Sequence, residues 1–280
     1  MAIRATNAPD GRLRRVEGRH NKLVKELRKA FSQSELTSDG YCAIEGARIL
    51  EEAIRSGLRI KTVFFSASAS GKAAKLLPQL GGHVETLLLP DALFSSIVPS
   101  DAPQGVAALV RLKNFSLEEV ITKAPYGPLL VLTGIQDPGN VGTILRSAEA
   151  FGAIGVLLGE GTVSPFNSKV VRGSAGSAFR LPVVQTKLDG AVPLLKQNSV
   201  RLLATSSHKG MPLHEAKLSG PVAIFIGNEG AGVPRNVLPA MDEMLAIPHS
   251  DQVESLNAGV AASIVLYEIA KQRAAAASSK

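Results

Sequence analysis

The 280-residue sequence contains no tryptophan and a single cysteine, Cys42. A lone cysteine excludes an internal disulfide framework, and the five histidines show no spacing typical of metal ligands. No apolar run reaches the roughly 20 residues that a membrane span needs, and the N-terminus lacks the basic-then-apolar order of a signal peptide. We therefore expect a cytoplasmic globular protein without a membrane segment and without a metal.

Acidic residues are also in short supply, with 24 Asp and Glu against 31 Lys and Arg and a formal net charge of +7. The basic residues gather early in the chain, at Arg4, Arg12, Arg14, Arg15, Arg19, His20, Lys22, Lys25, Arg28 and Lys29. This excess favours a polyanionic partner, because cations neutralise phosphates. A solvated helix face or a frayed terminus would explain the same charges.

Hydrophobic periodicity predicts an α/β domain over residues 1–112, with the basic segment as its N-terminal extension. The predicted helices are 21–31, 47–54, 72–80 and 91–97, and the predicted strands are 60–65, 84–88 and 105–109. Pro125, Gly127 and Pro128 mark residues 113–127 as a linker that contains a short acidic helix.

A second α/β domain is predicted over residues 128–273, followed by an Ala/Ser-rich tail over 274–280. Its apolar runs alternate with helical segments, and they cover residues 129–132, 155–158, 202–204, 222–226 and 244–247. Continuous apolar strands between helices are typical of a mostly parallel sheet that is covered on both faces. The pattern does not reveal the order of the strands.

The first informative segment, residues 137–152, follows the strand at 129–132 as a turn and a helix. Asn140 suits the N-cap position, and a helix N-terminus is a ready site for an anion. Arg146 and Glu149 fall off the apolar stripe of this helix. They could serve a functional site, or they could form an ordinary surface ion pair.

The second segment, residues 226–234, ends the strongest apolar strand and holds three glycines in six residues. Glycines permit close approach of the backbone to a ligand, and Asn228 and Glu229 add polar groups at the carboxyl edge of the strand. A plain turn could use the same glycines.

The third segment, residues 247–263, is a polar loop that enters a helix. Ser255 is a plausible N-cap, and the small residues that follow would let a cofactor or another backbone come close. A tightly packed core helix would explain the same composition.

Together the three segments resemble the sequence motifs of SpoU-type methyltransferases, a branch of the SPOUT superfamily, in order and in placement from Leu129 to Lys271. Residues 164–176 resemble the segment that follows the second strand in that family. The first domain is similar to the family's substrate-binding module, which has the L30e-type RNA-binding fold.

The resemblance implies an RNA 2′-O-ribose methyltransferase that uses S-adenosylmethionine, with a deep trefoil knot and an active site formed across a homodimer. It implies cofactor contacts at Gly227, Ile247, Leu256, Thr205, Asn228 and Ser206. The implied active-site residues are Asn140, Arg146, Glu229, Ser255 and Asn257. The sequence departs from the family at His249 and Asp251, where an apolar residue and a glycine are more usual.

The resemblance casts Arg146 as the group that takes the proton of the ribose hydroxyl. Full deprotonation of a guanidinium at neutral pH costs about 8 kcal/mol, at 1.36 kcal/mol for each pKa unit. We therefore expect Arg146 to contact the phosphate and the hydroxyl, to stabilise developing alkoxide charge, and to take part in any proton transfer only late.

The added N-terminal domain favours 23S ribosomal RNA as the substrate, with transfer RNA as the alternative. A non-catalytic RNA-binding dimer is a second alternative. A Rossmann-type nucleotide enzyme is disfavoured, because neither glycine-rich turn shows GxGxxG followed by an acidic residue about twenty positions later.

Overall fold

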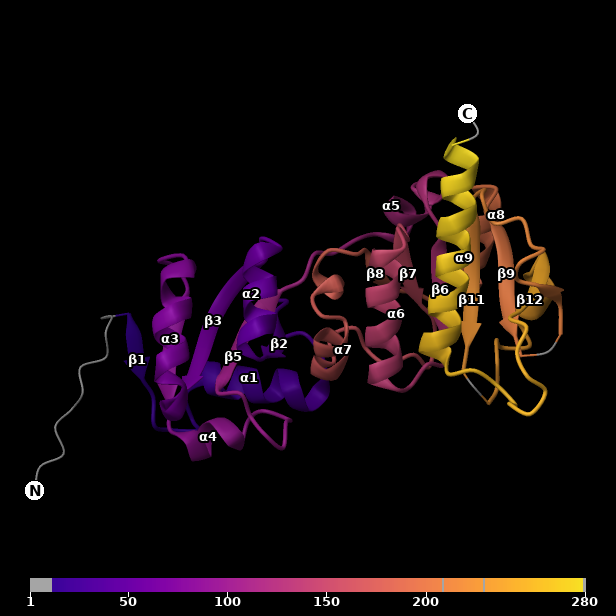
Figure 1. Ribbon diagram of the computed structural model, residues 1–280. Helices are drawn as coiled ribbons and strands as arrows, with labels where there is room; N and C mark the ends of the chain where they lie inside the picture. Colours follow the sequence, from indigo (N-terminus) through magenta and orange to yellow (C-terminus); the bar gives the residue numbers. More distant parts are fainter. Residues whose placement is uncertain (1–11, 208, 229, 279–280) are drawn as a thin grey trace, which may run out of the picture. The chain divides into compact units, whose positions relative to one another are not determined.

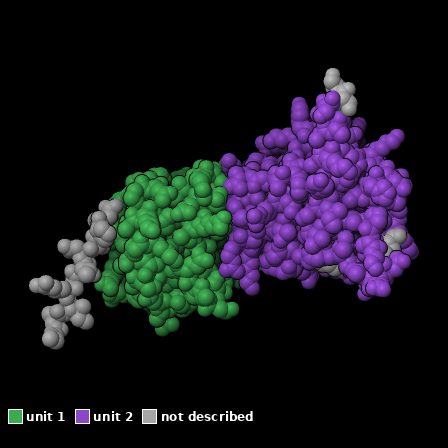
Figure 2. Space-filling view, in the orientation of Figure 1, with its two compact units in different colours: residues 1–112, 166–168 green, residues 113–165, 169–280 purple. Residues whose placement is uncertain are grey.

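The computed structural model describes residues 12–207, 209–228 and 230–278, which form two compact units (Figure 2). The first unit comprises residues 1–112 with 166–168, and the second comprises residues 113–165 with 169–280. Within the described ranges, no helix is long and apolar enough to cross a membrane.

The first unit holds a mixed sheet of five strands in the order β1-β4-β3-β5-β2. The strands are β1 (Leu13–Arg15), β2 (Cys42–Glu45), β3 (Arg59–Ser66), β4 (Glu85–Leu89) and β5 (Val106–Arg111). Strands β1, β4 and β3 run parallel, whereas β5 pairs antiparallel with both β3 and β2. The helices are α1 (Lys22–Gln33), α2 (Ala47–Arg55), α3 (Ser70–Leu76) and α4 (Asp91–Ser95).

Helix α1 shows how the sequence builds this unit. Its N-cap is Asn21, whose side-chain oxygen accepts from the backbone N–H of Leu23 at 2.9 Å. Leu27 and Phe31 of α1 are buried in a cluster with Phe64 of β3. Cys42 is fully buried in β2, and this burial raises the pKa of its thiol to about 12. The thiol therefore stays protonated and is no candidate nucleophile.

The second unit holds a fully parallel sheet of seven strands in the order β10-β12-β9-β11-β6-β7-β8. The strands are β6 (Leu129–Thr133), β7 (Gly155–Leu158), β8 (Val183–Gln185), β9 (Arg201–Ser206), β10 (Met211–Pro212), β11 (Val222–Gly227) and β12 (Glu243–Ala246). The helices are α5 (Leu117–Ile121), α6 (Pro138–Ala150), α7 (Ser168–Gly173), α8 (Leu188–Gln197) and α9 (Ala258–Ser278).

Alternate residues of the central strands pack on opposite faces of this sheet. Leu130 and Leu132 of β6 belong to a core that they share with α6 and α9, whereas Leu129 and Val131 belong to a core that they share with α5 and α8. Helices α6 and α9 run side by side along one face (Figure 1). A parallel sheet buried on both faces explains why its strands are continuous apolar runs.

These observations confirm the predicted fold class, an α/β chain whose C-terminal sheet is parallel. The trefoil knot and the L30e-type fold stay predictions. Residues 113–127 contain α5, which begins with a capping box formed by Ser116 and Glu119 and is buried against α8. Helix α9 continues to Ser278, so the predicted tail is helical to that residue, and residues 279 and 280 lie outside the described ranges.

Candidate functional site

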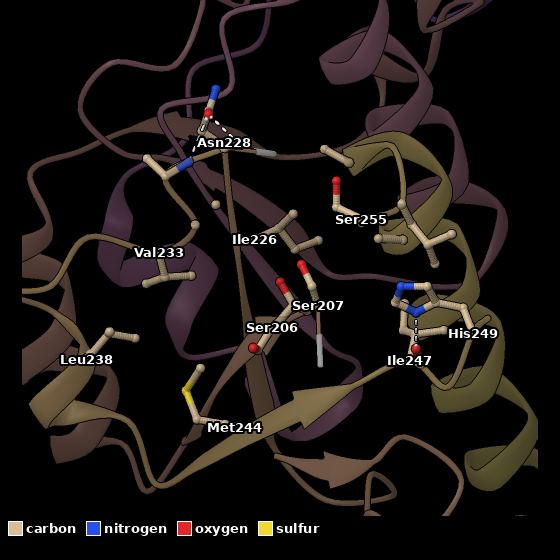
Figure 3. Close-up of a pocket in the computed structure, with 18 residues that line it drawn as sticks. Ser206, Ser207, Ile226, Asn228, Val233, Leu238, Met244, Ile247, His249 and Ser255 are labelled. Atoms are coloured by element: carbon tan, nitrogen blue, oxygen red, sulfur yellow. Dashed lines mark hydrogen bonds between the residues drawn. The ribbon is translucent and has the colours of Figure 1, made fainter. Parts of the chain in front are cut away.

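A cavity of about 300 Å³ opens at the carboxyl ends of β9, β11 and β12 (Figure 3). The loops that follow these three strands supply most of its walls. The lining residues are Thr205, Ser206, Ser207, Ile226, Gly227, Asn228, Gly230, Ala231, Gly232, Val233, Leu238, Met244, Ile247, His249, Ser255, Leu256, Ala258 and Ala261. Ligands of parallel α/β sheets bind at this edge, beyond the carboxyl ends of the strands.

Only glycine fits at position 227, because the loop after β11 brings the backbone of Gly232 and Val233 against it. A Cβ atom at Gly227 would lie 2.0 Å from the carbonyl carbon of Gly232 and 2.3 Å from the backbone nitrogen of Val233. The backbone N–H of Gly232 also donates to the carbonyl oxygen of Asn228 at 2.7 Å. The cavity wall at this loop is therefore made largely of backbone.

The side chain of Asn228 holds this loop together. Its Oδ1 accepts from the backbone N–H of Gly230 at 2.9 Å and of Ala231 at 3.2 Å, while its Nδ2 donates to the carbonyl oxygen of Gly134 at 3.3 Å. Thr205 is engaged in a similar way, since its hydroxyl donates to the carbonyl oxygen of Phe225 at 3.1 Å. Both residues line the cavity while their polar groups fix its walls.

The loop after β12 carries both departures from the family pattern. Nδ1 of His249 lies 2.7 Å from the carbonyl oxygen of Ile247, and because a carbonyl only accepts, Nδ1 carries a proton and donates. In Figure 3, His249 and Ser255 lie on one side of the cavity and Val233 and Leu238 on the other. Asp251 is exposed and is not among the lining residues.

The structure corrects both predicted helix caps. The N-cap of α6 is Asp137, whose carboxylate accepts from the backbone N–H of Asn140 at 2.9 Å, because proline at 138 takes the first helical position. Helix α9 begins at Ala258, after Asn257 rather than after Ser255. Oδ1 of Asn257 accepts from the first free N–H groups of that helix, at 3.0 and 3.2 Å.

These two helix starts are joined by a side-chain hydrogen bond. Nδ2 of Asn257 donates to Oδ1 of Asn140 at 2.8 Å, and farther along the helices the hydroxyls of Ser147 and Ser263 lie 2.7 Å apart. The first and third sequence motifs therefore meet through Asn140 and Asn257. Neither asparagine is among the residues that line the cavity.

Arg146 is exposed on α6 and does not pair with Glu149. Glu149 instead accepts from Nε and Nη2 of Arg180 at 2.5 and 2.8 Å, and these hydrogen bonds lower the pKa of the Glu149 carboxyl. The alternative of an Arg146–Glu149 surface ion pair is therefore wrong. Among the described residues, no hydrogen bond or ion pair engages the Arg146 guanidinium, which is not part of the cavity wall.

Glu229, predicted as an active-site residue, lies outside the described residues. The described residues that line the cavity include no carboxylate, ammonium or guanidinium group, and His249 is their titratable member. Within the described ranges, no three His, Cys, Asp or Glu side chains gather as a metal site would require.

Comparison with known proteins agrees with this geometry. The SpoU rRNA Methylase family matches residues 127–267, about half of the chain, and the MRM3-like substrate binding domain matches residues 21–108. The chain belongs to the SpoU rRNA methylase family. The two matches fall in the second and the first unit of this SpoU methylase, respectively.

Two curated relatives cover almost the whole SpoU methylase chain. The 23S rRNA (guanosine(2553)-2′-O)-methyltransferase of Bacillus subtilis is 33% identical over 92% of this chain and 99% of its own length. The 23S rRNA (uridine(2479)-2′-O)-methyltransferase of Streptomyces viridochromogenes is 27% identical over 93% of each chain. The crystal structure of an AdoMet-bound rRNA methyltransferase from Sinorhizobium meliloti superposes with a TM-score of 0.79 at 27% identity, over 93% of this chain and 98% of that one.

All six residues predicted to contact a cofactor line the cavity of this SpoU methylase, and so does Ser255. Sequence reasoning missed its apolar wall, formed by Val233, Leu238 and Met244. Leu238 and Met244 belong to two short elements that follow the glycine loop. Hydrophobic periodicity over so few residues does not show that their side chains point into the cavity. The signal that could have found Val233 is its position directly after the third glycine.

Proposed function

We propose that this chain transfers a methyl group from S-adenosylmethionine to the 2′-hydroxyl of a ribose in 23S ribosomal RNA. The observation that carries the proposal is that the loops of the second and third motifs line the same cavity, in a chain of this family. The two relatives that act on 23S rRNA by their names match 92% and 93% of this chain, so the likeness includes the N-terminal domain. With 23S rRNA as its substrate, the chain would act in the cytoplasm.

The cavity suits S-adenosylmethionine in size and in chemistry. Its volume of about 300 Å³ is in the range of small-molecule sites. Val233, Leu238 and Met244 offer an apolar wall for a purine, while the glycine loop and the hydroxyls of Ser206 and Ser207 offer polar groups. Because no Lys or Arg is among the described lining residues, the wall does not repel a cationic sulfonium. When bound, the cofactor supplies an electrophilic methyl group.

The residues of the chain then position and stabilise the ribose. The guanidinium of Arg146 is exposed and not engaged by any described residue, so it is available for a phosphate or a hydroxyl of the RNA. Ser255 lines the cavity, and among the described residues nothing hydrogen-bonds its hydroxyl. Asn140 and Asn257 fix the start of α6 against the start of α9, which sets the direction of the helix that carries Arg146. Such positioning supplies much of the rate in group transfer.

Replacing Arg146 tests this mechanism. We expect Arg146→Ala to lower methyl transfer at least about a hundredfold, the usual cost of removing a donor to developing negative charge. S-Adenosylmethionine binding by calorimetry should stay within about twofold, since Arg146 is not part of the cavity. Lys196→Ala, which removes an exposed charge from α8 of the same unit, is the control and should leave turnover unchanged. Full turnover by Arg146→Ala would remove Arg146 from the mechanism, and failure to bind the cofactor in the parent chain would favour a non-catalytic RNA-binding protein.

We also propose that two copies of the chain pair through α9. Val260, Ile264 and Tyr267 recur at helical spacing on this helix and are 48%, 37% and 58% exposed. An apolar stripe of this kind is typical of a protein interface. The parent chain should therefore have the mass of a dimer in sedimentation, and Ile264→Lys that of a monomer. Ala274→Lys adds the same charge farther along α9 and should stay dimeric, whereas a monomeric parent chain would contradict the pairing.

A further inference from the structure

Helix α1 of the first unit carries a cationic face. Lys22, Lys25, Arg28 and Lys29 fall within an arc of roughly 120° around the helix, at about 100° for each residue. The buried residues of α1 lie on the opposite side, and they are Leu23, Val24, Leu27, Ala30 and Phe31. The three lysines are exposed and Arg28 is half-buried. We call these four residues the α1 cation face.

Carboxylates of the described residues do not compensate this charge. The one acid of α1, Glu26, binds Nζ of Lys61 at 2.6 Å, and Lys61 also binds Asp39 at 2.7 Å. No side chain of the α1 cation face makes a hydrogen bond or an ion pair with another described residue. Like charges three and four positions apart destabilise a helix by a few tenths of a kcal/mol for each pair, roughly 0.2–0.5. The α1 cation face therefore lowers the stability of the free protein, and an anionic partner would relieve this repulsion.

We propose that the α1 cation face binds the phosphate backbone of the substrate RNA. This inference rests on the proposed function, since it takes the RNA as the partner. The helix lies within residues 21–108, which match a substrate binding domain. Lysine ammonium groups contact phosphates as point charges, without reading bases. The face thus holds the RNA in a sequence-independent way, and it is separate in the chain from the residues of the cavity.

Salt dependence of RNA binding tests the face directly. The variant is Lys22→Gln, Lys25→Gln, Arg28→Gln and Lys29→Gln together, because glutamine keeps helix propensity while removing charge. The control carries four glutamines at exposed lysines that are scattered over the chain, Lys75, Lys123, Lys196 and Lys217. Both proteins lose four positive charges. The probe is 23S rRNA transcribed in vitro, titrated at several salt concentrations.

We expect the α1 variant to bind at least tenfold more weakly at low salt. The slope of log affinity against log salt should fall by about three, because each phosphate contact contributes roughly 0.7–0.9. The scattered control should keep the slope of the parent chain to within about one. The KM for RNA should rise while kcat stays within about twofold, since the cavity is untouched. The α1 variant should melt no lower than the parent chain, because it loses the repulsion between like charges on the helix.

Equal losses in the two variants would show that binding follows net charge, and an unchanged slope would show that the face makes no phosphate contact. Either result overturns the inference. If the four-residue variant melts early, Lys25→Gln with Lys29→Gln is the second variant, and its slope should fall by about 1.5. Failure of the parent chain to bind S-adenosylmethionine, with the slope change intact, would refute the proposed function and leave the α1 cation face standing.

Discussion

Gly227 is the residue at which the cavity is most sensitive to a single added carbon. Gly227→Ala would place a methyl group 2.0 Å from the carbonyl carbon of Gly232, so the loop must open. We expect at least a tenfold loss of S-adenosylmethionine affinity by calorimetry and a stability loss of about 1–3 kcal/mol, the usual cost of overpacking. Gly190→Ala in α8 is the control, because nothing lies within 4 Å of its added carbon and Gly190 does not line the cavity. Equal affinities for the two variants would contradict this account of the loop.

At the same scale, the sequence was a better guide to which residues gather than to which hydrogen bonds they make. The six residues predicted to contact a cofactor line one cavity together with Ser255, whereas Asn257 of the third motif does not. The two predicted helix caps were wrong. In each case two good capping residues lie a few positions apart, Asp137 and Asn140 for α6, and Ser255 and Asn257 for α9. Local propensity alone cannot choose between two such neighbours. The choice follows from Pro138 and from the contact between α6 and α9.

At the scale of elements, Asn257 serves two helices at once, as the cap of α9 and as the donor to Asn140 of α6. Asn257→Ala removes both functions and should cost about 1 kcal/mol of stability. Asn257→Ser keeps a capping oxygen but cannot reach Asn140, so its melting temperature should stay near that of the parent chain. Methyl transfer should fall about tenfold in both variants, because α6 loses a positioning contact. If Asn257→Ser transferred methyl groups as fast as the parent chain, the hydrogen bond to Asn140 would have no part in positioning α6.

Long apolar elements were predictable and short edge strands were not. The strands β6, β7, β9, β11 and β12 match apolar runs within two residues at each end. β1, β8 and β10 are two or three residues long, and they lie at the edges of their sheets. They are too short to show an apolar run or an alternation, and β8 offers only the apolar pair Val183 and Val184. β2 is buried but spans four residues, which is too short for its period to be visible.

At the scale of the whole molecule, fold class and family followed from the sequence, whereas the strand order did not. Continuous apolar runs indicated a parallel sheet covered on both faces, and the seven-stranded sheet confirms it. The order β10-β12-β9-β11-β6-β7-β8 depends on pairing between residues far apart in the chain, which local periodicity does not record. This order brings the loops after β9, β11 and β12 together, and so it creates the cavity.

The most direct test of the central claim is a map of ribose 2′-O-methylation in total RNA from cells with and without the gene. The account predicts that one methylated ribose of 23S rRNA is lost without the gene. The intact protein should restore it, and Arg146→Ala should not. Loss of methylation confined to transfer RNA, or no loss in any RNA, would contradict the assignment.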